Sequence, residues 1–231
     1  MAERAAAEYY PVLLDLRGRA CAVIGGGAVA EGKVDRLLAA GARVTVVSPS
    51  LTARLAAWAG ESRLRHVARA YAAGDLAGHA LAFVAVGDRA VAAAVAEEAR
   101  RLGIWANAAD DPARCDFILP SVLRRGRLVV SVSTGGASPG LARAIREDLE
   151  GRFTADFGAL LDLVAEVRNE VRASTGGAVA AASGARAPIA GVPAAAWRHA
   201  LDPALRRLVV GGRRDEAKAW LHARLQEVAC R

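Results

Sequence analysis

The stretch "ACAVIGGGAVAEGK" (residues 20–33) decides the fold of the first half of the chain. Its opening residues, 20–25, form a short apolar run, which predicts a buried β-strand. The helix predicted after it, residues 29–41, places Val34, Leu37 and Leu38 on one face and ends at a glycine. A strand, a glycine-rich turn and a helix in this order are typical of the first unit of a parallel α/β sheet.

The glycine turn also carries a binding motif. Gly25, Gly27 and Ala30 have the GxGxxA spacing, directly between a strand and a helix. The first glycine permits the tight turn, the second lets a pyrophosphate approach the backbone, and the alanine allows the helix to pack closely on the strand. The helix N-terminus offers N–H groups to phosphate. We therefore predict a dinucleotide site formed by Gly25, Gly26, Gly27, Ala28 and Val29, against the alternative of a glycine-rich turn without a ligand.

One element of the usual dinucleotide fingerprint is absent. An Asp or Glu about 20 residues after the glycines commonly bonds the adenosine ribose, but the second predicted strand, residues 42–48, runs into Ser48, Pro49 and Ser50. We expect these three residues to line the ribose. The serine hydroxyls suit a ribose diol or, together with Arg54, a 2′-phosphate, so residue chemistry alone leaves NAD and NADP unseparated.

The α/β pattern continues to about residue 112. Further strands are predicted at 80–88 and 104–110, and helices at 51–58 and 89–103. Residues 1–112 are therefore predicted to form a Rossmann-type, NAD-binding domain with a parallel sheet.

The pattern then changes. Residues 117–134 read as two strands joined by a turn at 124–127, and a helix starts at Pro139, so we predict a strand hairpin and helix over 113–150. Residues 151–231 are predicted to be a small helical C-terminal region, with a helix at 154–172, a flexible Gly/Ala/Ser/Pro linker at 173–195 and two short helices at 195–210 and 215–228.

Composition limits the class of protein. The three cysteines are odd in number and dispersed, which favours free thiols in a reducing cytoplasm. No signal peptide and no apolar run of membrane-spanning length is present, so we expect no membrane partner. The net charge of +7 suits a polyanionic partner. An aromatic content of 5% and the lack of a nucleic-acid-binding signature argue against nucleic acid and favour a polycarboxylate small molecule.

Three motifs in sequence order carry a family resemblance: "GGGAVAEGK", "GARVTVVSP" and "NAADDPARCDFILPSVLRRGRLVVSVSTGGASPGLARAIREDLE". Over about residues 9–150 the chain resembles the precorrin-2 dehydrogenase family, the module that begins sirohaem synthases. The resemblance implies an oxidoreductase that uses NAD to convert precorrin-2 to sirohydrochlorin, a tetrapyrrole with eight carboxylates. It also implies a homodimer joined through the segment after the nucleotide domain.

The resemblance leaves one activity open. Some family members also insert Fe²⁺ into the product, so Fe²⁺ as a second substrate stays an open alternative. Sirohaem synthases continue into a methyltransferase domain, and because the sequence ends at Arg231 we expect none here.

The stretch "NAADDPARCDF" (107–117) supplies the catalytic candidate. Asp110 follows a predicted strand at the carboxyl edge of the sheet, where α/β folds bind ligands, and is suited to accept a proton. It aligns with the aspartate to which catalysis is attributed in the family. Asp111 either raises the pKa of Asp110 or starts a turn before Pro112. Cys115 and Asp116 are expected to be structural.

We predict no resident metal site. Hard carboxylates with one thiol form a mismatched ligand set. The four histidines are far apart in sequence: His66, His79, His199 and His222.

The loop "STGGASP" (133–139) has two interpretations. Ser133, Thr134, Gly135 and Ser138 could hold a substrate carboxylate at a helix N-terminus. Alternatively the loop is an ordinary helix start, with Ser138 as N-cap and Pro139 as first helical residue. A different class of function, an NAD(H)-sensing regulatory module, would need the glycine loop but neither Asp110 nor this loop.

Overall fold

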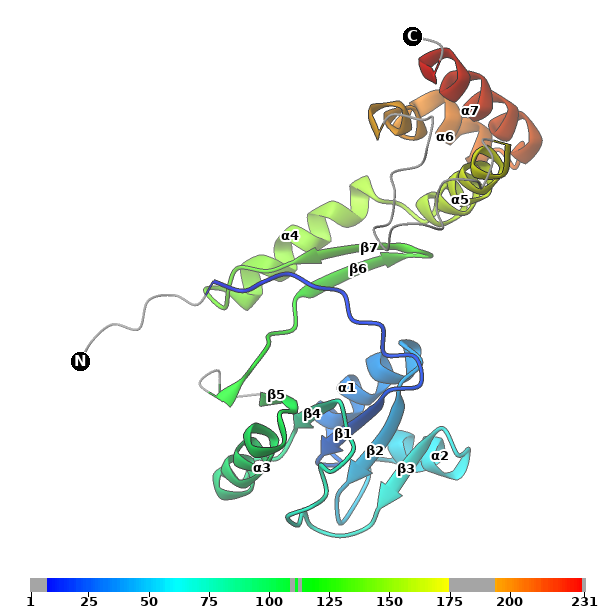
Figure 1. Ribbon diagram of the computed structural model, residues 1–231. Coiled ribbons are helices and arrows are strands. Elements are labelled where there is room, and N and C mark those ends of the chain that lie inside the picture. Colours follow the sequence, from blue (N-terminus) through cyan, green and yellow to red (C-terminus); the bar gives the residue numbers. More distant parts are fainter. Residues whose placement is uncertain (1–7, 109–110, 112–113, 175–193, 230–231) are drawn as a thin grey trace, which may run out of the picture. The chain divides into compact units, whose positions relative to one another are not determined.

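Figure 1 shows the chain as a computed structural model, in which residues 8–108, 111, 114–174 and 194–229 are described. The chain forms two compact units, Met1–Leu119 and Pro120–Arg231. The elements of the first unit are β1 (Ala20–Ile24), α1 (Ala28–Ala39), β2 (Arg43–Val47), α2 (Ala53–Gly60), β3 (Leu64–Val67), β4 (Leu81–Val84), α3 (Arg89–Leu102) and β5 (Trp105–Ala108).

The first unit is a five-stranded parallel sheet in the order β3-β2-β1-β4-β5 (Figure 1). Side chains of β1 alternate between two cores. Cys21 and Val23 pack with α1 and α2 on one face, and Ala22 and Ile24 pack with α3 on the other. This confirms the predicted Rossmann-type fold.

Strand order places the switch point of the sheet between β1 and β4. From β1 the chain goes to β2 on one side, while β4 and β5 lie on the other side. In such sheets the crevice outside the carboxyl ends of these two strands is where ligands bind. The glycine turn after β1 lies at this position.

The sequence analysis missed strand β3. Its four residues, "LRHV", lie at the sheet edge, and only Leu64 is buried while Arg65 is exposed. A strand with one buried side chain has no hydrophobic alternation to detect.

The second unit begins with an antiparallel hairpin. Its elements are β6 (Ser121–Arg125), β7 (Leu128–Val132), α4 (Pro139–Arg152), α5 (Asp156–Ser174), the 3₁₀ helix η2 (Ala194–Leu201), α6 (Pro203–Val210) and α7 (Arg214–Ala229). Leu123 of β6 pairs with Val130 of β7, and the two strands are joined by the turn that the sequence predicted. At this turn Gly126 has φ +54°, and a Cβ built on it would lie 3.0 Å from the Cα of Gly158 in α5.

The C-terminal helices form their own core. Its buried members are Phe157, Leu160, Leu163, Val167, Ala196, Leu205, Ala217, Leu221 and Leu225. The single helix predicted over 195–210 is wrong, because the chain changes from η2 to α6 at Asp202-Pro203. Asp202 caps α6 by accepting from the N–H of Ala204 (2.7 Å), and a proline at the first helical position restricts the residue before it. Of the predicted linker 173–195, residues 175–193 lie outside the described residues.

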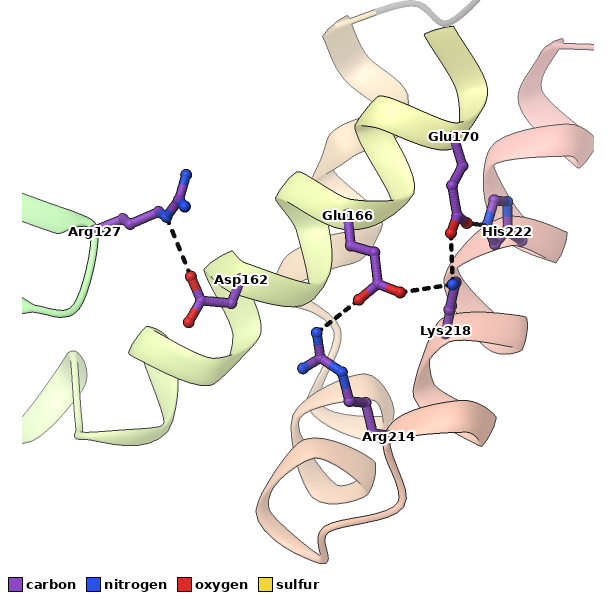
Figure 2. A network of polar contacts seen from close by, with 7 residues as sticks. All are labelled: Arg127, Asp162, Glu166, Glu170, Arg214, Lys218 and His222. Atoms are coloured by element: carbon purple, nitrogen blue, oxygen red, sulfur yellow. Dashed lines mark hydrogen bonds and ion pairs between the residues drawn. The ribbon is translucent and has the colours of Figure 1, made fainter. Parts of the chain in front are cut away.

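Ion pairs join α5 to α7 (Figure 2). Glu166 accepts from Arg214 and Lys218, both at 2.6 Å, and Glu170 accepts from Lys218 at 2.6 Å and from His222 at 2.9 Å. The hydrogen bonds from Lys218 lower the pKa of both carboxyl groups. Among the helices described, none has the length and apolar character needed to cross a bilayer.

Candidate functional site

The first glycine of the motif is fixed by the backbone of two strands. Gly25 donates its N–H to Val47 O at 2.9 Å and has φ +120°, where other residues are strained. A Cβ on Gly25 would lie 2.3 Å from the carbonyl oxygen of Ala85, just after β4. The position therefore needs glycine for both its conformation and its close packing.

The second glycine is buried under the segment that follows β2. A Cβ on Gly26 would lie 2.0 Å from Ser50 O and 2.8 Å from Ser48 Oγ. Gly26 O also accepts from the N–H of Thr52 at 2.9 Å. The structure thus brings Gly26 together with Ser48 and Ser50, two of the residues predicted to line the ribose.

The remaining residues of the motif are open. Gly27, Ala28 and Val29 are exposed, and a Cβ on Gly27 would meet no atom within 4 Å. Gly27 is the N-cap of α1, and this helix start has no side-chain cap. An open backbone at an uncapped helix N-terminus is a cradle that fits a pyrophosphate.

The segment after β2 is held from both sides. Ser48 is only 7% exposed, and its carbonyl oxygen accepts from His66 Nε2 at 2.9 Å. Pro49 and Ser50 are exposed. The segment therefore presents its last residues, beside the glycine loop, to solvent or ligand.

Arg54, the predicted partner of a 2′-phosphate, is paired with carboxylates of α1. Its Nη2 donates to Asp35 Oδ1 at 3.1 Å, and its Nη1 lies 3.5 Å from Glu31 Oε1. The guanidinium also lies 4.5 Å from the ring centroid of Trp58. Glu31 accepts a further hydrogen bond from Thr52 Oγ1 at 2.7 Å. The sequence analysis did not identify Glu31, Asp35 or Thr52.

Asp110, the catalytic candidate, lies outside the described residues, as does Pro112. The chain on either side is described. Ala106 and Asp116 are joined by two bonds, from the N–H of Ala106 to Asp116 Oδ2 at 2.8 Å and from the N–H of Asp116 to Ala106 O at 2.9 Å. Asp116 therefore bonds the backbone of β5, as expected.

Cys115 also has a structural place. Its Sγ donates to Ala108 O at 3.2 Å, and burial raises the pKa of the thiol. A neutral, hydrogen-bonded thiol is unreactive. Within the described part of the chain, no group of three His, Cys, Asp or Glu residues could hold a metal ion.

Asp111 forms a turn. Its carboxylate pairs with Arg114 at 2.8 Å, and its carbonyl oxygen accepts from the N–H of Arg114 at 3.0 Å. These two contacts are those expected of the turn interpretation of Asp111.

Lys33 and Asn107 form a further polar contact at the site, and the sequence analysis missed this contact. Lys33 Nζ lies 5.3 Å from the ring centroid of Phe83 in β4. Asn107 is 7% exposed and donates its Nδ2 to Phe117 O at 3.0 Å. Phe117 packs edge-on against Phe83, with centroids 5.6 Å apart. Lys33 stands three residues after Ala30, the last residue of the glycine motif, and this closeness is the signal that could have drawn attention to it.

The predicted substrate residues lie in one loop of the second unit, between β7 and α4. Thr134 Oγ1 accepts from the N–H of Ser138 and donates to Ser138 O, both at 3.0 Å. Ser138 Oγ accepts from the N–H of Leu141 at 3.1 Å and so caps α4, and Ser133 Oγ accepts from the N–H of Gly135 at 3.2 Å. The helix-start interpretation is therefore correct for Ser138, and each of the three hydroxyls serves the loop.

A groove of about 580 Å³ runs along α3 and does not include the glycine loop. It is lined by Tyr71, Ala72, Ala73, Ala90, Val91, Ala94, Glu97, Glu98 and Arg101. At its base Glu98 accepts from the Tyr71 hydroxyl and from the N–H of Gly74 at 2.8 Å. The buried Glu98 carboxylate is thus hydrogen-bonded within the protein itself.

Comparisons with known proteins agree with this geometry. Residues 12–121 match a family described as putative NAD(P)-binding, and residues 125–152 match one described as sirohaem biosynthesis protein, central. A sirohaem synthase of Methylococcus capsulatus is 44% identical over 165 residues, covering 71% of this chain and 35% of the relative. One of Thiobacillus denitrificans is 37% identical over 221 residues, covering 96% of this chain and 43% of the relative.

The chain thus spans less than half the length of these relatives. A solved precorrin-2 dehydrogenase, SirC, superposes with a TM-score of 0.68 at 26% identity, over 93% of this chain and 100% of that one. The chain is thus similar to sirohaem synthases and to a precorrin-2 dehydrogenase, with an NAD(P)-binding match over residues 12–121 and a sirohaem biosynthesis match over residues 125–152, in agreement with the resemblance carried by the motifs of residues 9–150.

Proposed function

We propose that the protein is a precorrin-2 dehydrogenase that uses NAD to produce sirohydrochlorin. The glycine cradle at the switch point carries this proposal, because it fits a dinucleotide in a chain whose fold matches SirC over 93% of its length. The sensing alternative has no observation in its favour.

The residues of the first unit divide the work of binding. The backbone of Gly25, Gly26, Gly27, Ala28 and Val29 holds the pyrophosphate, and Ser48, Pro49 and Ser50 line the ribose. When bound, NAD supplies the acceptor for a hydride from the macrocycle. A proton must leave the substrate as well, and we assign its acceptance to Asp110, since a positioned carboxylate suits this task.

The second unit supplies the substrate and partner surfaces. We assign a carboxylate of the tetrapyrrole to the loop of Ser133, Thr134, Gly135 and Ser138, which its internal hydrogen bonds hold in shape before a ligand arrives. The formal charge of +7 favours a substrate with eight carboxylates.

We assign the interface of the homodimer to the β6–β7 hairpin and α4. A two-stranded hairpin is marginally stable alone, and Leu123 is the one buried hydrophobic residue of β6 and β7. Leu141 and Ile145, one turn apart on α4, are 54% and 40% exposed. A second copy covering this apolar face would complete the packing. Free thiols at Cys21 and Cys115 agree with work in the reducing cytoplasm.

The experiment is an anaerobic assay with precorrin-2 and NAD⁺, followed by absorbance. Wild-type protein should form sirohydrochlorin, and Asp110→Asn should lose about 10²- to 10⁴-fold of the turnover while binding NADH normally. Asp111→Asn is the matched control and should keep most of the activity, because its carboxylate belongs to a turn.

Binding of NAD⁺ without turnover by the wild type would contradict the proposed activity. Full turnover in Asp110→Asn would remove only the assignment of the base. Addition of Fe²⁺ to the same reaction decides whether the metal is a second substrate, by formation of sirohaem.

A further inference from the structure

We infer that Glu31 and Asp35 hold Arg54 away from the cofactor and thereby make the site select NAD over NADP. The inference rests on the part of the proposed function in which the glycine loop binds a dinucleotide. It does not depend on the substrate or on the base.

A chain of contacts places these three residues beside the ribose position. The loop after β2 lies on the glycine loop, since Gly26 O accepts from the N–H of Thr52 at 2.9 Å. Thr52 Oγ1 in turn donates to Glu31 at 2.7 Å, and Arg54 follows two residues later as the second residue of α2. In dinucleotide-binding folds, residues after the second strand meet the 2′ group of the adenosine ribose.

The charges at this place are unfavourable for a phosphate. Two carboxylates, Glu31 and Asp35, face one guanidinium, that of Arg54. The Glu31 side chain is 24% exposed, so solvent screens it less than the 53% exposed Asp35. A 2′-phosphate brings up to two further negative charges and would need Arg54 as its partner. It would therefore have to compete with both carboxylates for the same guanidinium.

The aromatic contact limits how far Arg54 can move. Its guanidinium stacks 4.5 Å from the Trp58 ring centroid, on the same helix. Stacking and two ion pairs together favour this position of the Arg54 side chain, although the side chain is 57% exposed. A neutral 2′-hydroxyl makes no demand on Arg54, since the serine hydroxyls at the end of β2 suit it. NAD thus binds with the charge cluster intact.

The test measures the dissociation constants of NADH and NADPH by quenching of tryptophan fluorescence in full-length protein. Wild type should bind NADH more tightly. In the double variant Glu31→Gln, Asp35→Asn, the ratio of the NADPH constant to the NADH constant should fall about tenfold, since both competing charges are removed. Glutamine at 31 keeps an acceptor for Thr52. Glu97→Gln, which removes an exposed carboxylate paired with an arginine of α3, should leave the ratio unchanged.

A third change identifies the phosphate ligand. Adding Arg54→Met to the double variant should return the ratio to the wild-type value or above. The inference is overturned if the ratio is unchanged in the double variant. It is also overturned if the ratio falls in the double variant and stays low after Arg54→Met is added. These results are independent of turnover: tight NADH binding with no oxidation of precorrin-2 sinks the proposed activity alone, and no binding of either dinucleotide sinks both.

Discussion

Lys33 Nζ donates a hydrogen bond to Asn107 Oδ1 at 3.0 Å and so joins α1 to the end of β5. The same side chain also bonds Phe117, because the amide nitrogen of Asn107 donates to Phe117 O at 3.0 Å. One side chain thus links the helix of the glycine cradle to both ends of the segment that contains Asp110.

Replacement of Asn107 by leucine should destabilise the first unit. The change leaves the carbonyl oxygen of Phe117 without this donor and removes an acceptor from Lys33, which should cost about 1–3 kcal/mol of unfolding free energy. Asn107→Asp keeps an acceptor for Lys33 and should lose less. Urea unfolding measures both variants. Equal stability of Asn107→Leu and wild type would show that the contact contributes nothing.

Replacement by alanine should affect stability at Gly26 and cofactor binding at Gly27. A Cβ on Gly26 meets Ser50 O at 2.0 Å, so Gly26→Ala must displace the loop after β2 and should lower the melting temperature. Gly27→Ala has free space and should fold normally, but if the proposed cradle holds the pyrophosphate, the methyl group should obstruct its approach to the backbone and weaken NADH binding. Thermal melts and NADH titrations separate the two effects. Undiminished NADH affinity in Gly27→Ala would mean that the cradle does not hold the phosphates.

Acid should weaken the contact between α5 and α7. The pKa values of Glu166 and Glu170 are lowered in the folded protein from an ordinary value of 4.5. Their contribution is therefore complete above about pH 4.5 and is lost as the pH falls through the lowered values. At pH 7 the melting temperature, followed by circular dichroism, should be lower for the double variant Glu166→Gln, Glu170→Gln than for wild type. Near pH 3 the two proteins should converge, and a gap that persists there would contradict the assignment.

The exposed face of α4 should decide the oligomeric state. Leu141→Glu, Ile145→Glu places two charges on the proposed contact and should give monomers by sedimentation velocity, with normal far-ultraviolet circular dichroism because both side chains are exposed. Leu201→Glu is the matched control, since Leu201 is a 62% exposed apolar residue of η2. A double variant that sediments like wild type would rule out this face.

The fold followed from the sequence where local patterns are strong. The turn at residues 25–27 was found because glycine spacing, strand and helix coincide within 14 residues. Strand β3 was missed because these residues become a strand through pairing with β2, and no local sequence pattern indicates that pairing.

The site was harder to predict because its contacts join distant residues. Lys33 and Asn107 are 74 positions apart, and nothing in the spacing of either indicates the other. Arg54 was predicted as a cation for a 2′-phosphate, but its pairing with Glu31 and Asp35 depends on how α2 packs beside α1. The assignment of Asp110 rests on the family motif and on its place in the sequence after a strand, and it stays a prediction.

The close approach of Gly126 and Gly158 has a consequence for how the sequence can vary at these two positions. At this point main chain meets main chain: a Cβ on Gly126 would be 3.0 Å from the other glycine's Cα, and one on Gly158 would be 3.4 Å from the backbone nitrogen of Gly126. No side chain takes part, so a neighbouring substitution cannot readily compensate for a larger residue at either position. We therefore expect related sequences that have glycine at position 126 to have glycine at position 158 as well.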